Sequence, residues 1–304
     1  MSRIQERAGD IVAVSRTSGA LVREGIARLG AAGIEHARQE AEWLLGRLLG
    51  AKPFELYVEE REVPGPMVDH FFAQLDARAR GIPLQYLLGE VEFLGDRLSV
   101  GPGVFIPRPE TEAVVEAALG PLRAIAARAA RPLRLLDLGT GSGCIAVALA
   151  KRLPACFVVG LDVSWCAVCI AQRNVRRHGL EAVVRLIQGR WTEALGGTFD
   201  GIISNPPYVA SAQVDRLPLD VRREPRISLD GGADGLRDLW QLMDQVPRVL
   251  APGGLLVLEC AEEHVDVLVR AASAASWVER VSPVQDLAGR PRGILVIRTG
   301  QQPH

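Results

Sequence analysis

Several features that would point to particular classes of protein are missing from this chain. Its 35 basic residues nearly balance 36 acidic ones, so it has no overall positive charge of the kind on which nonspecific nucleic-acid binding depends. No apolar run reaches the roughly 18 to 20 residues that a membrane-spanning helix needs, and the first residues contain no signal-peptide core. We therefore expect a soluble, cytoplasmic protein. A mitochondrial presequence is the alternative, supported by Arg3, Arg7 and Arg16 and opposed by Glu6 and Asp10.

Cysteine is also scarce. The five cysteines are an odd number, which suits a reducing compartment better than a disulfide framework. Cys166 and Cys169 form a C-x-x-C pair, a pattern that can bind a metal or take part in redox chemistry. A structural zinc site needs four ligands, and the sequence has no second pair. We interpret the pair as part of a helix from Trp165 to His178 and predict no metal, while the role of the two thiols stays open.

The length of 304 residues predicts one large domain with a smaller companion. Residues 1–16 are expected to form a flexible tail. From residue 17 to 84, apolar residues recur at helical spacing between charges, which predicts a small helical bundle. A substrate-binding role for this bundle follows only from the family resemblance described below. Residues 85–112 are interpreted as a connector. In residues 88–100, apolar and polar residues alternate on either side of a Gly-Asp turn, as in a β-hairpin, and the residues that follow are rich in proline. Residues 113–304 form the predicted large domain.

Three aromatic residues of the predicted bundle, Trp43, Phe54 and Tyr57, could either lie in its core or contact a partner. We expect them in the core, since apolar residues at helical spacing usually pack inward.

Strand-like and helix-like segments alternate through the large domain, which predicts an α/β fold with a parallel sheet covered on both faces. The expected strands are residues 133–138, 157–161, 183–187, 199–204 and 255–260. Two final strands, residues 278–283 and 293–298, follow each other without a helix between them. They suggest an antiparallel hairpin at one edge of the sheet.

A glycine-rich loop follows the first of these strands. Its residues are Gly139, Thr140, Gly141, Ser142 and Gly143, and a helical segment comes next. Cys144 stands where a dinucleotide-binding G-x-G-x-x-G loop has its third glycine, which argues against NAD or FAD. Asp162 ends the next strand, where a carboxylate can accept both ribose hydroxyls. A cofactor that bears adenosine without a pyrophosphate fits this pattern, and S-adenosyl-L-methionine is such a cofactor.

The apolar run Phe199–Ser204 ends abruptly in Asn205-Pro206-Pro207-Tyr208. Two successive prolines can neither continue a strand ladder nor start a helix, so the strand stops there. The motif presents a side-chain amide oxygen, the carbonyls of Asn205 and Pro206, and an aromatic ring. Such a stiff set of acceptors suits a planar group that carries an NH2. An ordinary proline turn is the alternative.

Four motifs in this order resemble the release-factor glutamine methyltransferase family (PrmC/HemK), over about residues 20 to 298. They are Pro83–Tyr86, Ile106–Glu112, Asn205–Tyr208 and Glu224–Leu236. The resemblance implies a Rossmann-like class I S-adenosylmethionine-dependent methyltransferase sheet with an antiparallel edge hairpin, joined by a β-hairpin to a small N-terminal helical bundle. It also implies methyl transfer to the side-chain amide nitrogen of the glutamine in the Gly-Gly-Gln motif of class-I peptide-chain release factors.

The resemblance further implies roles for particular residues. Gly139 to Gly143 would line the methionine portion of the cofactor, Asp162 would hold the ribose, and Trp191 would lie beside the adenine. Asn205, Pro206, Pro207 and Tyr208 would hold the glutamine, with Asn205 also next to the cofactor. The family often has an acidic residue where this chain has Arg190, beside an apparent one-residue insertion, so the adenine contacts and the role of Arg190 stay open. The role of Arg108 also stays open.

An amide nitrogen is a poor nucleophile because its lone pair is delocalised into the carbonyl. If Asn205 Oδ1 and the Pro206 carbonyl each accept one N–H, the nitrogen is aimed at the methyl group and its growing positive charge is stabilised. Tyr208 would pack on the amide plane, which makes Asn205, Pro206 and Tyr208 the predicted catalytic residues. Asparagine would also reject glutamate, whose oxygen would face an acceptor.

Three alternatives remain at this point: an enzyme that methylates the amino group of adenine in nucleic acid, one that methylates glutamine in a large-subunit ribosomal protein, and a non-catalytic binding protein. The mixed charge of the bundle favours a protein substrate, and we expect a monomer with no stable nucleic-acid or membrane binding.

Overall fold

The computed structural model describes residues 16–193 and 195–300, and the chain separates after Leu88 into two compact units. The predicted flexible tail, residues 1–16, lies outside the described residues except for Arg16. None of the helices in the described ranges is both long and apolar enough to cross a membrane.

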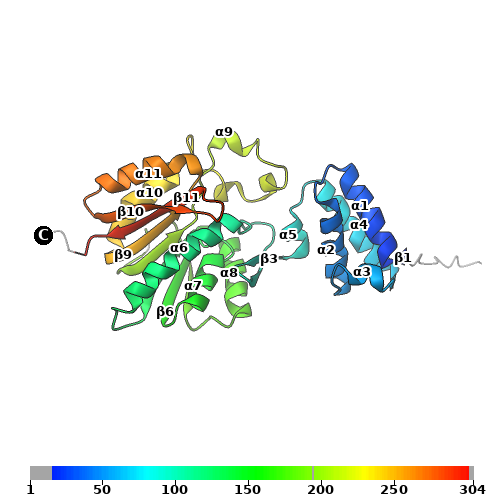
Figure 1. Ribbon diagram of the computed structural model, residues 1–304, viewed down its shortest axis with the longest axis horizontal. Helices are drawn as coiled ribbons and strands as arrows, with labels where there is room; N and C mark the ends of the chain where they lie inside the picture. The colour runs from blue at the N-terminus through cyan, green and yellow to red at the C-terminus, as the bar shows by residue number, and fades with distance from the viewer. Residues whose placement is uncertain (1–15, 194, 301–304) are drawn as a thin grey trace, which may run out of the picture. The chain divides into compact units, whose positions relative to one another are not determined.

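The first unit is a small helical bundle (Figure 1). Its elements are β1 (Arg16–Thr17), α1 (Ser18–Ala31), α2 (Ala37–Leu49), α3 (Glu55–Val58), β2 (Glu62–Val63), α4 (Gly65–Ala79) and α5 (Leu84–Leu88). Thr17 caps α1 by accepting the Ala20 amide, and Gly50 ends α2 in a left-handed conformation. The core contains one buried ion pair, in which Arg78 donates to both oxygens of Glu40.

The expectation that Trp43, Phe54 and Tyr57 lie in the core of this unit is wrong. Their exposed fractions are 41%, 62% and 39%. On α2, the buried positions Ala41, Leu44 and Leu45 already form the inward stripe, so Trp43 falls on the other side of the helix.

The second unit is built on a seven-stranded sheet with the strand order β10-β11-β9-β8-β5-β6-β7. Its strands are β5 (Leu133–Leu138), β6 (Cys156–Asp162), β7 (Val184–Gln188), β8 (Phe199–Ser204), β9 (Leu250–Glu259), β10 (Val278–Gln285) and β11 (Pro291–Arg298). Strands β7, β6, β5, β8 and β9 run parallel, whereas β11 and β10 are antiparallel at one edge. The predicted α/β fold with an antiparallel edge hairpin is confirmed.

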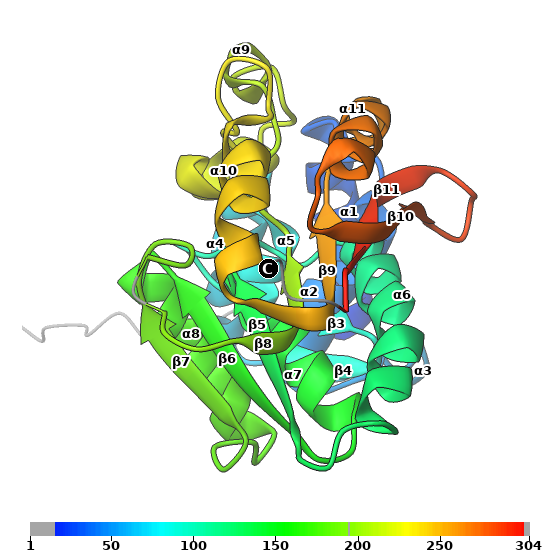
Figure 2. The same ribbon diagram turned by 90° about the vertical axis from the view of Figure 1, so that its left-hand side faces the viewer.

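Helices cover both faces of this sheet (Figure 2). Their bounds are α6 (Pro109–Ala126), α7 (Cys144–Arg152), α8 (Trp165–Arg177), α9 (Ser211–Val214), α10 (Arg237–Gln245) and α11 (Glu262–Ala274), with short 3-10 turns η1 (Val221–Arg223), η2 (Arg226–Ser228) and η3 (Val246–Arg248). One core cluster joins α6, α7 and α8 to the sheet, and a second joins α10 and α11 to its other face. Such a layered arrangement leaves the carboxyl ends of the parallel strands free to form a site.

The predicted hairpin is β3 (Glu90–Phe93) and β4 (Asp96–Ser99), and it belongs to the second unit. Leu94 and Gly95 both have positive φ, as a tight two-residue hairpin turn requires. Asp96 pairs with Lys151 and Arg152 of α7, and Phe93 and Leu98 pack in the first core cluster.

One buried side chain joins the hairpin to the glycine loop. Asn174 of α8 donates to the carbonyl oxygens of Ser99 at 2.9 Å and Ser142 at 2.8 Å, and its Oδ1 accepts the Ser99 amide at 2.6 Å. The Asn174 side chain is fully buried, so losing it leaves the Ser142 carbonyl without a partner in the interior and the Ser99 groups only partly accessible to water.

We predict that Asn174→Ala lowers the free energy of unfolding by about 2–3 kcal/mol, since one buried and two partly buried backbone groups lose their partner. Urea unfolding monitored by circular dichroism measures this. Arg173→Ala, at an exposed neighbouring position on α8, is the control and should change stability by less than about 0.5 kcal/mol. Equal effects from the two variants would contradict the assignment.

Candidate active site

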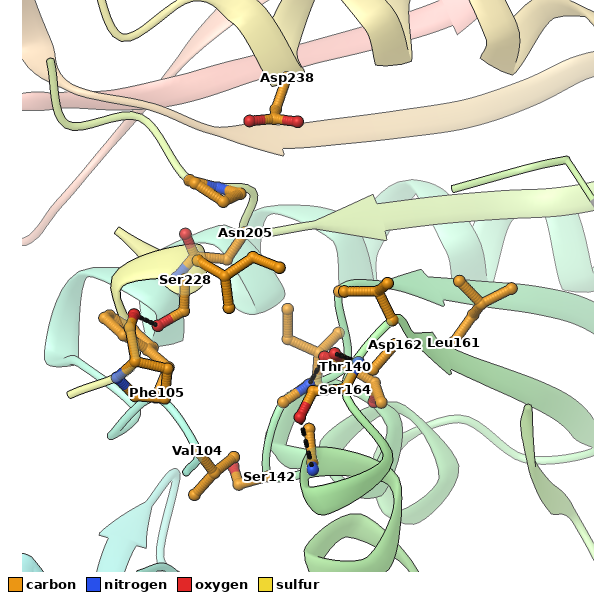
Figure 3. A pocket seen from close by; sticks show the side chains of 18 of the residues that line it. Val104, Phe105, Thr140, Ser142, Leu161, Asp162, Ser164, Asn205, Ser228 and Asp238 are labelled. Carbon is orange, nitrogen blue, oxygen red and sulfur yellow. Dashed lines mark hydrogen bonds between the residues drawn. The ribbon is translucent and has the colours of Figure 1, made fainter. Parts of the chain in front are cut away.

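A cavity of about 270 Å³ opens at the carboxyl ends of β5, β6 and β8 (Figure 3). Figure 3 shows Thr140, Asp162 and Ser164 on one side of this cavity and Phe105, Asn205 and Ser228 on the other. The residues that line it come from six parts of the second unit: 103–111, 139–145, 161–167, 189–191, 205–207 and 225–238.

The glycine loop turns sharply between β5 and α7. Gly139, Gly141 and Gly143 all have positive φ, which side-chain-bearing residues rarely adopt. The amides of Gly139 and Thr140 donate to the Leu161 carbonyl at 2.8 and 2.9 Å, which ties the loop to the end of β6. A Cβ on Gly143 would lie 3.1 Å from the Ala171 Cβ, so this position also has little space for a side chain.

Asp137 lies fully buried beneath the loop. Its Oδ2 accepts both the Thr140 hydroxyl at 2.6 Å and the Ala146 amide at 3.0 Å, whereas Oδ1 has no hydrogen-bond partner in the described part of the chain. Burial raises the pKa of this carboxyl to about 7, and the nearby charge of Asp162 adds to the rise.

Asp162 ends β6 and lines the cavity beside the glycine loop. One carboxylate oxygen accepts the Gly141 amide at 2.9 Å and the other accepts the Ser164 amide at 2.8 Å. A carboxylate has about four acceptor sites, so this arrangement fixes the group and leaves sites for a ligand. Burial raises its pKa, although the backbone hydrogen bonds oppose that rise.

Trp191 also lines the cavity, together with Arg190. Trp191 adopts a positive φ of 44°, an unusual backbone for a bulky residue, directly after Arg190, where the sequence departs from the family pattern. A Cβ on Gly139 would lie 3.7 Å from its ring, which places the indole against the glycine loop. The predicted adenine contact of Trp191 stays a prediction.

The Asn-Pro-Pro-Tyr motif supplies the opposite wall. Asn205 and Pro207 line the cavity, and Asn205 Nδ2 donates to Thr111 Oγ1 of α6 at 3.0 Å. Pro206 is buried, and the Tyr208 ring packs against the second core cluster while its hydroxyl donates to Glu259 Oε1 at 3.1 Å. The described structure therefore places Asn205 and Pro207 at the cavity, and Tyr208 in contact with a buried carboxylate.

The proline-rich segment before α6 is fixed by an ion pair between Arg108 and Glu224. Glu224 also accepts the Ile106 amide at 2.8 Å, and the Arg108 guanidinium lies 4.9 Å above the centre of the Phe105 ring. Since Phe105 lines the cavity, this pair holds one of its walls against the segment after the Asn-Pro-Pro-Tyr motif. The ion pair with Glu224 therefore gives Arg108 a structural role, which the sequence alone did not reveal.

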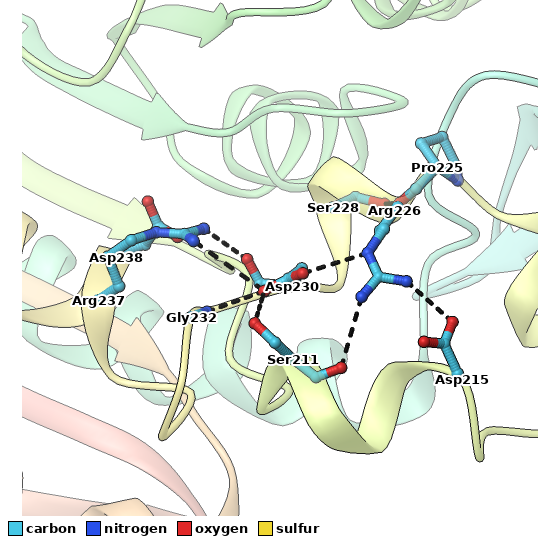
Figure 4. A network of polar contacts seen from close by, with 9 residues as sticks. All are labelled: Ser211, Asp215, Pro225, Arg226, Ser228, Asp230, Gly232, Arg237 and Asp238. Carbon is cyan, nitrogen blue, oxygen red and sulfur yellow. Dashed lines mark hydrogen bonds and ion pairs between the residues drawn. The ribbon is translucent and has the colours of Figure 1, made fainter.

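A polar network holds the segment from Ser211 to Asp238 (Figure 4), and residues of its second half line the cavity. Asp230 accepts the Ser211 hydroxyl at 2.6 Å and the Gly232 amide at 3.0 Å, and these bonds lower its pKa. Arg226 bridges Asp230 and Asp215. The network presents Ile227, with an exposed fraction of 60%, at the edge of the cavity.

Sequence reasoning did not single out Glu224 or Glu259 as separate functional residues. A usable signal was present for Glu259, because an acidic residue directly after Leu255–Leu258 places a carboxylate at the end of a buried strand. Cys166 and Cys169 are free and exposed, and the described residues contain no group of three or more His, Cys, Asp or Glu positioned to hold a metal. The absence of a metal stays a prediction.

Known proteins are similar to this chain over most of its length. A family described as the PrmC N-terminal domain matches residues 20–89, and one described as the Methyltransferase small domain matches residues 122–219. A release factor glutamine methyltransferase from Moorella thermoacetica is 40% identical over 90% of this chain and 96% of its own length. One from Geobacter sulfurreducens is 46% identical over 75% of this chain and 78% of its own length.

Among solved structures, the hMettl16 catalytic domain in complex with MAT2A 3′UTR hairpin 6 matches 80% of this chain and 86% of its own, with a TM-score of 0.53 and 14% identity. At that identity the likeness shows the fold alone. The sheet order, the antiparallel edge and the glycine loop define a class I S-adenosylmethionine-dependent methyltransferase. Within this class, the chain belongs to the release factor glutamine methyltransferase family.

The buried Asp137 generates a prediction about pH. Its pKa is about 7 in the folded protein and about 3.9 when unfolded, so the folded state holds an extra proton between those values. The free energy of unfolding therefore falls as the pH rises between these two pKa values, because the folded state must give up this proton. Asp137→Asn keeps an oxygen for both hydrogen bonds and removes this cost.

We expect Asp137→Asn to gain stability relative to the wild type between pH 4 and pH 8, on the order of a few kcal/mol. Urea unfolding of both proteins at the two pH values measures the difference. A difference that is the same at both pH values would contradict the raised pKa.

Proposed function

We propose that this protein methylates the side-chain amide nitrogen of the glutamine in the Gly-Gly-Gln motif of class-I peptide-chain release factors, with S-adenosyl-L-methionine as the donor. The observation that carries the proposal is the meeting of the glycine loop and the Asn-Pro-Pro-Tyr motif at one cavity. A Cβ on Gly139 would lie 3.8 Å from the Asn205 carbonyl oxygen, so the two loops face each other closely. The names of the curated relatives support the substrate class.

The residues present fit the donor. Three positive-φ glycines let the loop turn sharply with no side chain at those three positions, and Asp162 lines the cavity with acceptor sites to spare. Gly139 to Gly143 would hold the methionine portion, Asp162 the ribose and Trp191 the adenine. When bound, S-adenosyl-L-methionine supplies a methyl group on a positively charged sulfur.

The protein's own contribution would be orientation. Asn205 Oδ1 and the Pro206 carbonyl would each accept one N–H of the substrate amide, which fixes its nitrogen in a near-attack position. The same acceptors would stabilise the positive charge that develops on the nitrogen. The amide proton becomes acidic as the N–C bond forms, and it can leave to water. Tyr208, fixed by Glu259, would support the loop and complete the catalytic set with Asn205 and Pro206.

We extend the proposal to the setting of the reaction. A substrate of the translation machinery implies a cytoplasmic protein, and the five free cysteines are compatible with a reducing compartment. We propose a monomer that meets the release factor transiently.

The proposal is tested by incubating the protein with labelled methyl donor and a purified class-I release factor. We expect label on the wild-type release factor and none on a form whose tripeptide glutamine is replaced by alanine. Label that persists on the alanine form would direct the search to another acceptor. Label on RNA or on ribosomal protein instead would favour one of the other substrate classes.

We predict that Asn205→Ala lowers kcat by about two orders of magnitude, the usual effect of removing one preorganised polar group. Steady-state methylation of the release factor measures this, with thermal unfolding to show that the variant is folded. Wild-type turnover by a folded Asn205→Ala enzyme would refute the proposed orientation mechanism.

A further inference from the structure

Asp238 is a carboxylate at the cavity that takes no part in the proposed methyl transfer. It lies in the first turn of α10 and lines the cavity, although the residue is only 4% exposed. Figure 3 shows its carboxylate turned from α10 toward the other residues that line the cavity. In the described part of the chain its one polar partner is Arg237, which donates to Oδ2 at 2.8 Å. Because a carboxylate has about four acceptor sites, Asp238 can still accept hydrogen bonds from a ligand.

Stabilisation of the helix does not by itself account for this placement. A carboxylate in the first turn of a helix is favourable because of the helix dipole. An exposed side chain would provide that stabilisation without the cost of burying a charge. The start of α10 already has such a residue, Asp234, which is exposed and whose Oδ1 accepts the Leu236 amide at 3.0 Å. The burial of Asp238 beside a cavity instead suits a group that meets a donor on a ligand.

The face of α10 that carries Asp238 is turned toward the segment after β7. Gln245, two helical turns after Asp238, lies on the same face of the helix. Its Oε1 accepts the Thr192 amide at 3.3 Å and the Thr192 hydroxyl at 3.0 Å. Thr192 directly follows Trp191, which packs against the second core cluster, to which Leu239 of α10 belongs. Asp238 therefore projects toward the end of the cavity that Trp191 lines.

The side chains of the segment after β7 lack the acceptor that the amino group of an adenine base needs. Arg190 and Trp191 line the cavity there, and a guanidinium or an indole can donate hydrogen bonds but not accept them. Of the described residues that line the cavity, Asp162 and Asp238 are the two with carboxylates. Asp162 ends β6 and is assigned to the ribose in the proposed function. Asp238 is therefore the carboxylate that is free to complement the amino group of the base.

We propose that Asp238 binds the exocyclic amino group of the adenine of S-adenosyl-L-methionine and makes the site selective for a base that carries this group. The inference rests on the cofactor site of the proposed function and deepens it. Arg237 holds Asp238 in place, because the same guanidinium donates to the Asp230 carbonyl and so joins Asp238 to the polar network (Figure 4). The hydrogen bond to the base and the stacking surface beside it then come from two different elements, α10 and the segment that contains Trp191.

The test compares two ligands, S-adenosylhomocysteine and its analogue that carries purine in place of adenine and so has a hydrogen where the amino group was. Isothermal titration calorimetry of the full chain measures the two dissociation constants. Their ratio cancels the contributions of the ribose and of the amino-acid portion, which both ligands share. We expect the wild type to prefer S-adenosylhomocysteine by about tenfold to a hundredfold, the usual effect of a hydrogen bond to a charged group.

Two substitutions at Asp238 probe the carboxylate. Asp238→Ala removes the acceptor, and the preference should fall to less than about threefold. Asp238→Asn keeps the shape of the side chain and one acceptor oxygen without the charge, so its preference should lie between those of the wild type and Asp238→Ala. Circular dichroism shows whether each variant is folded. If Asp238→Ala does not fold, the wild type and the isosteric Asp238→Asn still decide the question.

Asp244→Ala and Asp162→Ala are the controls. Asp244 is an exposed carboxylate on the same helix, and its removal should leave both affinities within about twofold of the wild type. Asp162→Ala should weaken both ligands by a similar factor, since both carry the ribose, and so leave the ratio unchanged. A substitution at Asp238 that merely loosened the cavity would behave like Asp162→Ala.

The outcomes separate this inference from the proposed function. An Asp238→Ala ratio equal to that of the wild type would overturn the role of Asp238, and so would a wild type that binds both ligands equally or an Asp244→Ala variant that loses the preference. Wild-type protein that shows the preference but does not methylate the release factor would refute the proposed function and leave the role of Asp238 in place. A folded protein that binds neither ligand would refute the cofactor site on which both depend.

Discussion

The register of β5 against β8 is the constraint on which the site depends. Leu138 pairs with Ser204, and the Ser204 hydroxyl donates to the Leu138 carbonyl at 2.7 Å. Leu138 also pairs with Leu161 on the other side. The next residues along the chain, Gly139 and Asn205, therefore leave the sheet side by side, with Asp162 next to them. A shift of one residue would turn every side chain of a strand to the opposite face and separate these groups.

Given that register, the remaining structure limits how the emerging loops can move. The Leu161 carbonyl and Asp162 accept three amides of the glycine loop, and Asn174 donates to the Ser142 carbonyl of the same loop. On the opposite wall, Glu224 fixes the proline-rich segment. Two buried acidic residues, Asp137 and Glu259, lie close to the site. Burial raises the pKa of both carboxyl groups, which means that ionising them inside the protein costs free energy.

Much of this architecture could be predicted from local sequence. The expected strands 133–138 and 199–204 coincide with β5 and β8, because short apolar runs that end in glycine or proline have sharp boundaries. β9 begins at Leu250, five residues before the expected start at Leu255, and its first residues include Pro252, Gly253 and Gly254, which are uncommon in strands. The core placement of Trp43 was wrong because helical spacing does not by itself show which apolar residue faces inward.

The partners within the site could not be predicted in the same way. Thr111 meets Asn205 across 94 residues of sequence, and Arg108 meets Glu224 across 116. No local propensity reports such pairs, because they exist only once the sheet order brings distant segments together. The motifs could indicate which residues carry the chemistry, while the tertiary structure was needed to show which residues hold them in place.

The most direct test of this account is a structure of the enzyme with S-adenosylhomocysteine and a release factor, or a peptide that contains its Gly-Gly-Gln motif. The account predicts the glutamine amide nitrogen at about 2.7–3.2 Å from Asn205 Oδ1, between the Asn-Pro-Pro-Tyr motif and the glycine loop. A glutamine bound elsewhere, or an Asn205 side chain turned away from it, would contradict the account.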